Sequence, residues 1–503
     1  MPWSPSAISL AALIAELPGA VLARGDAHTL ITGVTQDSRV VEPGDLFVAV
    51  PGLQRNGLEF VPDALRRQAA AVATEAVVDT TVPVIRVQNA REALADLSAA
   101  FYGHPSKGLP VVGITGTDGK TSTTHLLSAI LEAHGLRTGW LTTVNTRIGA
   151  DVRPNAVDHT TPEAPVIQRT LAEMRSAGVA VAIVETSSHA LALDRVRGTE
   201  FRVGVFTNLS PEHLNFHGTF EAYAAAKARL FERLPPDGLA VLNADDPNSA
   251  VMRAATRALV RTYGLAARAD VTAANVRLSP QGTRFVLQPD NVEVETRLVG
   301  RFNVSNWLAA YTAATFFGAG PQDLQAAAHQ QAPVPGRMNL VRAGQPFSVI
   351  VDFAHTPQAL EKAIDTIREL GVRRVMLVFG LAGGRDFANR PVMGELAARK
   401  ADFFVISSDD PGDENPADIA AEIAAGAGNG AQFNIELDRR VAIAQLLDRA
   451  EPGDAVLLAG KGHEQRMVVK NQRVPWNDAR VALELLAERG FAAPGSGKVE
   501  AVP

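Results

Sequence analysis

The segment with the clearest chemical signature is VVGITGTDGKTSTTHLL, which begins at Val111. A run rich in β-branched residues leads into a glycine-rich turn, and Lys120 and Thr121 then open a helical pattern. Such a turn directs backbone N–H groups at phosphate oxygens, while a lysine adds positive charge and a threonine hydroxyl can hold Mg²⁺. The strict Walker spacing is not met, because Gly113 lies one residue too far from Gly119. The pattern predicts a nucleotide phosphate loop, with an unliganded glycine turn as the alternative.

Three further residues could hold a metal ion. Glu185 ends the apolar pattern VAIVE, and the carboxyl end of a strand in a doubly wound sheet lies at the ligand crevice. His213 follows the strand pattern VGVFTN, where a neutral imidazole could complete a metal site, although a lone loop histidine is more often structural. Lys227 lies in a helical pattern beside three alanines, where most lysines are simply solvated. The residues alone therefore favour Glu185 as a ligand and leave the other two open.

From about Val111 onward, short apolar runs alternate with alanine-rich stretches that have helical periodicity, and the residues above lie within this part of the chain. The alternation predicts βαβ units and a largely parallel, doubly wound sheet. A second series of the same kind begins near Ser348, whereas the first 108 residues mix strand patterns with a helix expected near residues 61–68. The periodic signals stop and restart in glycine- and proline-bearing segments at residues 103–110 and 333–337.

We therefore predict an α/β protein of three domains. Residues 1–108 form a small mixed α/β domain, residues 109–335 a central P-loop ATPase-like domain with a parallel sheet, and residues 336–493 a C-terminal Rossmann-like domain. Residues 494–503 lack periodicity and are expected to be a disordered tail.

Composition limits the classes of function. Apolar residues make up 46% and charged residues 20% of the 503, with a net charge of −6, which favours neither disorder nor nucleic-acid binding. The chain has no cysteine, which excludes disulfides, thiolate metal sites and a cysteine nucleophile. The apolar stretch at residues 8–17 lacks the basic flank of a signal peptide and is expected to be a first helix. No run of about 18 apolar residues predicts a membrane span, so we expect a cytoplasmic protein.

The segment GTDGKTS resembles the G-T-x-G-K-[ST] phosphate loop of the Mur ligase family and of the related folylpolyglutamate synthetases. Further blocks resemble the family in order over roughly residues 35–485: VETSSHALALDRV, FTNLSPEHLNFHGTFEAYAAAKARLF, NADDP, GRFNVSN, PGRM, VDFAHTP, GRDFANRPVM and AGKGHE. The N-terminal QDSRVVEPGDLFVAVPG is similar to the MurE type, which adds the third residue to a UDP-N-acetylmuramoyl-dipeptide. The resemblance implies ATP-dependent amide ligation in peptidoglycan synthesis, with an acyl phosphate on D-glutamate and a diamino acid as the amine. The sequence does not show the oligomeric state, and a monomer is the default expectation.

The resemblance also implies roles for individual residues. Catalysis would fall to Lys120, Lys227, His213 and His355. ATP would be bound by Gly116, Thr117, Asp118, Gly119, Lys120, Thr121, Ser122, Asn303, Asn306, Arg337 and Asp352. Two Mg²⁺ ions would be held by Thr121, Glu185, His213 and a carbamylated Lys227, since a buried lysine of lowered pKa presents a neutral amine to CO₂. The UDP-linked substrate would meet Gln36, Ser38, Thr160, Thr161, Ser187 and Arg195, with the first domain on the uridine side. The amino acid would meet Arg385, Asp409, Asp410, Gly460 and Glu464.

One block departs from the family. Diaminopimelate-adding members carry Asp-Asn-Pro-Arg, whose arginine pairs with the distal carboxylate of the amino acid; here the block ends in Pro411 and Gly412. Losing a bidentate arginine weakens selection for a second carboxylate by on the order of a few kcal/mol. The sequence therefore describes a pocket for L-lysine or a similar basic amino acid better than one for meso-diaminopimelate.

Other departures leave the substrates open. They are His159, Glu212, Asn215 and Leu53, where the family usually has other residues. They allow a divergent paralogue that ligates another carboxylate and amine outside cell-wall synthesis. A nucleotide-gated binding protein without turnover and a mechanical P-loop ATPase are further alternatives.

Overall fold

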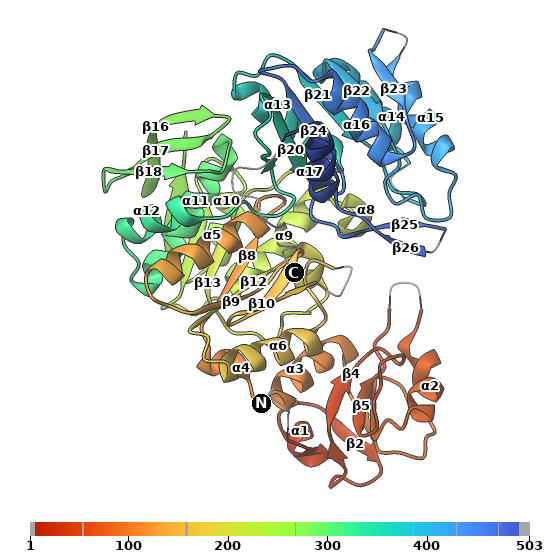
Figure 1. Ribbon diagram of the computed structural model, residues 1–503. Helices are drawn as coiled ribbons and strands as arrows, with labels where there is room; N and C mark the ends of the chain where they lie inside the picture. The colour runs from red at the N-terminus through yellow and green to blue at the C-terminus, as the bar shows by residue number, and fades with distance from the viewer. Residues whose placement is uncertain are drawn as a thin grey trace. The chain divides into compact units, whose positions relative to one another are not determined.

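The computed structural model describes residues 6–52, 55–155, 159–266, 268–385, 387–428, 430–470 and 472–491. Leu53 and the predicted tail at residues 494–503 lie outside this part of the chain. The chain forms two compact units, one made of residues 1–272 with 306–327 and the other of residues 273–305 with 328–503 (Figure 1). Each unit is described by itself.

The N-terminal part of the first unit has its own sheet. The strand order is β2 (Val21–Arg24), β7 (Val84–Arg86), β6 (Ala71–Thr74), β5 (Asp45–Val48) and β4 (Gly33–Thr35). β2 is antiparallel to β7, and the other neighbours are parallel. The remaining elements are β1 (Ile8–Ser9) paired with β3 (Leu30–Ile31), α1 (Leu10–Ala15), the 3₁₀ helix η1 (Gly57–Phe60), α2 (Val61–Arg66), α3 (Ala90–Phe101) and α4 (Pro105–Gly108). The first helix is shorter than expected, because the Ser9 hydroxyl caps it by accepting from Ala12 N–H.

A larger sheet forms the centre of the first unit. Within the first unit its order is β11 (Asp151–Pro154), β10 (Asn145–Ile148), β9 (Thr138–Leu141), β12 (Val181–Glu185), β8 (Val111–Thr115), β13 (Phe201–Phe206), β14 (Leu239–Asn243), β15 (Leu259–Gly264) and the start of β16 (Val271–Ser279). From β9 to β15 every pair is parallel, and the antiparallel β10 and β11 form the edge. Because β8 lies between β12 and β13, the carboxyl ends of these three buried strands meet at one edge.

Helices cover this sheet on both faces, as a parallel sheet requires. They are α5 (Lys120–Ala133), α6 (Ala164–Ser176), α7 (Ser188–Ala192), α8 (Leu214–His217), α9 (Phe220–Glu232), α10 (Ser249–Ala255), α11 (Arg301–Ala314), the 3₁₀ helix η2 (Thr315–Phe317) and α12 (Pro321–Gln330). Apolar residues of α6, α7, α9 and α10 form one core with alternate strand residues such as Ala182 and Val184. The helix α9 begins after Thr219, whose hydroxyl accepts from Ala222 N–H.

The second unit has a sheet of six strands with a Rossmann-like arrangement. The order is β19 (Asn339–Val341), β20 (Ser348–Asp352), β24 (Ala455–Ala459), β21 (Val375–Phe379), β22 (Phe403–Ile406) and β23 (Phe433–Ile435). All neighbours are parallel except β19 with β20. One face packs against α13 (Pro357–Glu369), α14 (Asn389–Lys400) and α15 (Pro416–Ala427), the other against α16 (Arg439–Arg449) and α17 (Asp478–Glu488). Two antiparallel hairpins complete the described part of this unit. The first pairs β17 (Gly282–Gln288) with β18 (Val292–Thr296) and follows β16 (Val271–Ser279), and the second pairs β25 (Arg466–Val469) with β26 (Gln472–Pro475).

The predicted α/β class is confirmed, with a mixed N-terminal sheet, a mainly parallel central sheet and a Rossmann-like C-terminal sheet. The exact domain boundaries stay predictions. In the described part of the chain no helix is both long and apolar enough to cross a membrane.

Candidate active site

The predicted phosphate loop connects β8 to α5 and depends on two glycines. Gly116 has φ +151°, and a Cβ there would overlap the Thr207 hydroxyl. Gly119 has φ +84°, and a Cβ there would press on the Asn306 side-chain oxygen. Because α5 begins at Lys120, its unpaired N–H groups open at the end of this loop. The geometry is that of an anion-binding turn.

The segment after β13 holds this loop in shape. Thr117 N–H donates to Asn208 O at 2.8 Å, and Asp118 N–H donates to Asn208 Oδ1 at 3.0 Å. The Thr207 hydroxyl donates to Asp118 O at 2.6 Å. The loop is therefore preformed by main-chain and side-chain bonds across neighbouring strand ends. Thr121 and Ser122, in the first turn of α5, are buried beneath it.

Two lysines share one carbonyl of the loop. Lys120 Nζ donates to Gly116 O at 3.0 Å and to Thr117 O at 2.8 Å. Lys227 Nζ, from α9, donates to the same Gly116 O at 2.8 Å, and this side chain is only 2% exposed. Burial lowers the pKa of Lys227 well below its usual value, and the positive charge of Lys120 lowers it further. Lys227 is thus a buried amine whose neutral form is favoured, beside the phosphate loop.

A tyrosine one helical turn before Lys227 joins the lysine helix to the loop. The Tyr223 ring centre lies 4.5 Å from Lys227 Nζ. Its hydroxyl is 3.0 Å from Thr117 Oγ1. Tyr223 is fully buried, so it separates Lys227 from water on this side.

A cluster of histidines lies on the other side of Tyr223. The ring centre of His213 is 6.3 Å from that of Tyr223 and 4.7 Å from that of His189. Burial lowers the pKa of His189 to about 4, with smaller contributions from His213 and His217. His213 itself has φ +55° and precedes α8. The predicted ligands His213 and Lys227 therefore both lie next to Tyr223.

Glu185 lies at the end of β12, next to β8, and is fully buried. Its carboxylate accepts from the Thr143 hydroxyl at 3.0 Å and from Thr143 N–H at 3.3 Å. Its main-chain oxygen accepts from Thr161 Oγ1 at 2.7 Å, and Thr161 Oγ1 accepts from Ser187 N–H at 3.0 Å. Arg195 donates to Thr161 O at 3.0 Å. Three predicted substrate residues therefore form one network beside Glu185.

The other residues predicted to bind substrate or ATP lie outside the network around Glu185. Thr160 is half-buried beside Thr161. Gln36 is half-buried and Ser38 is buried, both just after β4 in the N-terminal sheet. Asn306 accepts from Thr123 Oγ1 at 3.3 Å and lies against Gly119, next to the phosphate loop. Asn303, one turn earlier in α11, belongs to the second unit, where it donates to Val299 O at 2.9 Å.

In the second unit, the predicted nucleotide-side residues surround Phe353. The guanidinium of Arg337 lies 4.8 Å from the Phe353 ring centre, and the His355 ring lies 4.6 Å from it. Asp352 accepts from Met338 N–H at 2.7 Å and from Ala354 N–H at 2.9 Å. These bonds fix the segment after Arg337 to the end of β20.

The glycine before Arg337 packs against a distant loop. Gly336 has φ +65°, and a Cβ there would overlap the main chain of Gly462 and His463. Gly336 O also accepts from Phe353 N–H at 2.9 Å. Residues 336–337 are thereby attached to the loop that follows β24.

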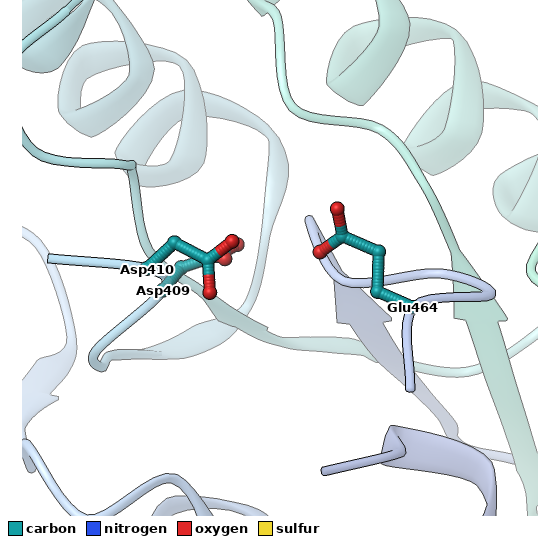
Figure 2. A group of neighbouring side chains, drawn as sticks. All are labelled: Asp409, Asp410 and Glu464. Atoms are coloured by element: carbon teal, nitrogen blue, oxygen red, sulfur yellow. The ribbon is translucent and has the colours of Figure 1, made fainter. Parts of the chain in front are cut away.

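Three carboxylates meet around a buried lysine at the carboxyl ends of β22 and β24. Figure 2 shows Asp409, Asp410 and Glu464 directed toward one another, close enough for a metal site by distance alone. Lys461 Nζ lies among them, however, 2.8 Å from Asp410, 2.5 Å from Glu464 and 3.6 Å from Asp409. Burial raises the pKa of Asp409 to about 6, opposed by the charges of Arg439 and Lys461. The cluster places three carboxylates around one buried ammonium group.

The remaining predicted amino-acid residues border this cluster. A Cβ at Gly460, which has φ +104°, would overlap the Asp409 carboxylate. Arg385 is exposed, and its charge opposes the rise that burial causes in the pKa of Glu464. Gly412 has φ +60°, and no atom lies within 4 Å of a Cβ built there. The Cβ position of the missing arginine is therefore unobstructed.

Three family models match the chain: "Mur ligase family, catalytic domain" over residues 30–102, "Mur ligase middle domain" over 114–314 and "Mur ligase, glutamate ligase domain" over 336–462. The chain is 45% identical over 485 residues to a UDP-N-acetylmuramyl-tripeptide synthetase of Roseiflexus sp., covering 92% of this chain and 95% of the relative. It belongs to the Mur ligase family.

Two further likenesses show how far the match extends. A UDP-N-acetylmuramoyl-L-alanyl-D-glutamate–2,6-diaminopimelate ligase of Geobacillus thermodenitrificans is 40% identical over 494 residues, covering 96% of this Mur ligase and all of the relative. A solved structure of a ligase with the same name has a TM-score of 0.68 at 30% identity and covers 96% of this chain and all of that chain. The similarity therefore spans every part of the site described above.

Sequence reasoning missed several residues that organise the site of this Mur ligase. Lys461 stands inside the quoted block AGKGHE, three residues before Glu464, and a turn brings the two side chains together. Tyr223 stands four residues before Lys227, which is one helical turn. The short separations of Lys461 from Glu464 and of Tyr223 from Lys227 in the sequence were the available signals for these two contacts. The pairing of Lys461 with Asp410, 51 residues earlier, had no local signal.

Proposed function

We propose that this Mur ligase joins a diamino acid to the D-glutamate of UDP-N-acetylmuramoyl-L-alanyl-D-glutamate, with ATP as the energy source, in peptidoglycan precursor synthesis. The observation that carries the proposal is the end-to-end similarity to ligases named for this reaction, together with the preformed phosphate loop. The reaction uses ATP and a UDP-linked substrate, so we place the enzyme in the cytoplasm, acting as a monomer.

The chain's own residues suit transfer of the γ-phosphoryl group to a carboxylate. The loop N–H groups would cradle the phosphates, and Lys120 would leave the loop carbonyls to meet them. The D-glutamate carboxylate takes the phosphoryl group and becomes an acyl phosphate, with ADP as product. The incoming amine attacks the acyl carbon, and the tetrahedral intermediate collapses with loss of phosphate. Arg337 and His355, which flank Phe353 in the second unit, are further candidates for contacts to the phosphates.

The residues at the strand edge fit the two Mg²⁺ ions that the family implies. Thr121 offers a hydroxyl, and Glu185 a fully buried carboxylate beside the phosphate loop. Lys227 is a buried amine of lowered pKa, so it can add to CO₂, release a proton and become a carbamate, which gives a third oxygen donor. His213, next to Tyr223, is the further candidate ligand. Mg²⁺ held there would neutralise negative charge on the phosphoryl oxygens.

The charges around Lys461 support a basic side chain on the incoming amino acid. Three carboxylates face one buried ammonium, so the pocket has room for a second positive charge. Gly412 offers no partner for a second carboxylate. We therefore expect L-lysine or L-ornithine to be accepted in preference to meso-diaminopimelate.

Restoring the missing arginine should shift this preference. In Gly412→Arg the new side chain enters open space, although φ +60° costs about 1 kcal/mol of strain. A bidentate bond to the distal carboxylate should raise the ratio of kcat/KM for meso-diaminopimelate over L-lysine by on the order of tenfold or more. Gly371→Arg is the matched control, because Gly371 also has positive φ and an open Cβ position. An unchanged ratio in Gly412→Arg would show that this loop does not set specificity.

Phosphate release measures the proposed function directly. The purified protein is given ATP, Mg²⁺ and UDP-N-acetylmuramoyl-L-alanyl-D-glutamate with meso-diaminopimelate, L-lysine or L-ornithine. We expect turnover only when both the acceptor and one of the amines are present. Release without the acceptor would indicate a plain ATPase. A protein that binds ATP but is silent with every amine would indicate the divergent paralogue.

A further inference from the structure

An ion pair with a buried arginine lies beside the amino-acid pocket. Arg390, in the first turn of α14, has a completely buried side chain. It makes a two-pronged bond to Glu414, with Nη1–Oε1 at 2.6 Å and Nη2–Oε2 at 2.8 Å. Nη1 also lies 3.0 Å from Glu422 Oε2. An arginine fork bound to both carboxylate oxygens fixes the orientation of the carboxylate as well as its place.

Glu414 uses the same carboxylate to hold a second loop. Its Oε2 accepts from Gly384 N–H at 2.9 Å. Gly384 directly precedes Arg385, and Glu414 follows Gly412 by two residues. One carboxylate therefore connects the loop that carries Arg385 to the loop that carries Gly412.

The two loops also touch through their main chains. Gly383 N–H donates to Asp410 O at 3.0 Å, and a Cβ at Gly383 would overlap Pro411 O. Asp410 in turn accepts from Lys461 Nζ and from Val468 N–H, each at 2.8 Å. The three segments that border the pocket thus form one bonded assembly, and Glu414 anchors it to α14 through Arg390.

We propose that Glu414 is a positioning residue for the amino-acid substrate. Its bond to Gly384 N–H sets the place of Arg385 relative to the acidic cluster, and Arg390 holds the carboxylate ready for this bond. The inference rests on the proposed function, because it takes residues 385, 409, 410 and 464 as the amino-acid pocket. It goes further in giving a role to two residues that do not touch the substrate.

A charge-neutral, equal-sized substitution isolates this role. Glu414→Gln keeps the volume but weakens the charge-assisted bonds to Arg390 and to Gly384. Arg390 is not left unpaired, because Glu422 remains 3.0 Å away, so the fold should survive. Glu422→Gln is the matched control, since it removes a carboxylate from the same arginine without touching Gly384.

The experiment compares full-length wild type, Glu414→Gln and Glu422→Gln. KM for the diamino acid is measured beside KM for ATP. A second assay omits the diamino acid and traps the acyl phosphate with hydroxylamine, which displaces phosphate and leaves a hydroxamate. We expect Glu414→Gln to raise KM for the diamino acid by about tenfold, with KM for ATP and hydroxamate formation unchanged, and Glu422→Gln to behave as wild type.

Other results overturn the inference. An unchanged KM for the diamino acid in Glu414→Gln removes the positioning role. An equal rise in Glu422→Gln, or a parallel fall in hydroxamate formation, shows a general structural role instead. A wild-type enzyme that forms the hydroxamate but accepts no diamino acid overturns the proposed function, and the inference with it.

Discussion

Lys227→Ala should lower ligase turnover by on the order of a thousandfold or more, the size of losing a transition-state stabilising group. The side chain is buried, bonds to Gly116 O and has a lowered pKa, so its neutral amine can form a carbamate. Alanine cannot supply that carboxylate. Turnover is measured as phosphate release with all substrates, and the fold is checked by circular dichroism and thermal melting.

Two controls separate the carbamate from a simple positive charge. Lys227→Arg keeps the charge but cannot react with CO₂ in this way, so it should be as inactive as the alanine variant. Added formate or acetate should restore part of the activity of Lys227→Ala by placing a carboxylate in the vacated space. Full activity of either variant without additives would contradict the carbamate. Activity of Lys227→Arg alone would show that only charge is needed.

Asp478→Ala should lower the free energy of unfolding of the second unit by about 3–5 kcal/mol, because it leaves a buried charge without its partner. Arg439 and Asp478 are both buried, with Nε–Oδ1 at 2.9 Å and Nη2–Oδ2 at 2.7 Å. Arg439 Nη2 also donates to Ala459 O at 2.7 Å. The pair therefore ties α16 and α17 to the end of β24. Denaturant unfolding followed by far-ultraviolet circular dichroism measures the change.

The neighbouring pair provides a matched control. Arg440 and Glu484 connect the same two helices at 2.7 Å, but both side chains are largely exposed. Glu484→Ala should therefore change stability by less than about 1 kcal/mol. Equal effects of Asp478→Ala and Glu484→Ala would show that burial does not decide the strength of these pairs.

Much of the fold could be predicted because local patterns carry it. VVGIT and VAIVE are apolar runs of strand length, and they form β8 and β12. The helical pattern around Lys227 forms α9 at Phe220–Glu232. These elements are set by residue types that stand next to one another in the chain.

The site was less predictable where it depends on distant partners. The phosphate loop has its glycines and lysine within five residues, so the sequence shows it. The burial of Lys461 depends on carboxylates about fifty residues away, and the pairing of Arg390 with Glu414 joins residues 24 apart. Charged residues in loops are usually solvated, so nothing local marks these as buried. Only the packing of strand ends brings them together.

The packing of Gly336 against the loop at Gly462 and His463 couples two predicted contacts. Arg337, expected at the nucleotide, and Glu464, expected at the incoming amine, stand on segments of the second unit that pack against each other. A change in one segment therefore disturbs the other, so a variant that loosens this packing should weaken the binding of ATP and of the diamino acid together.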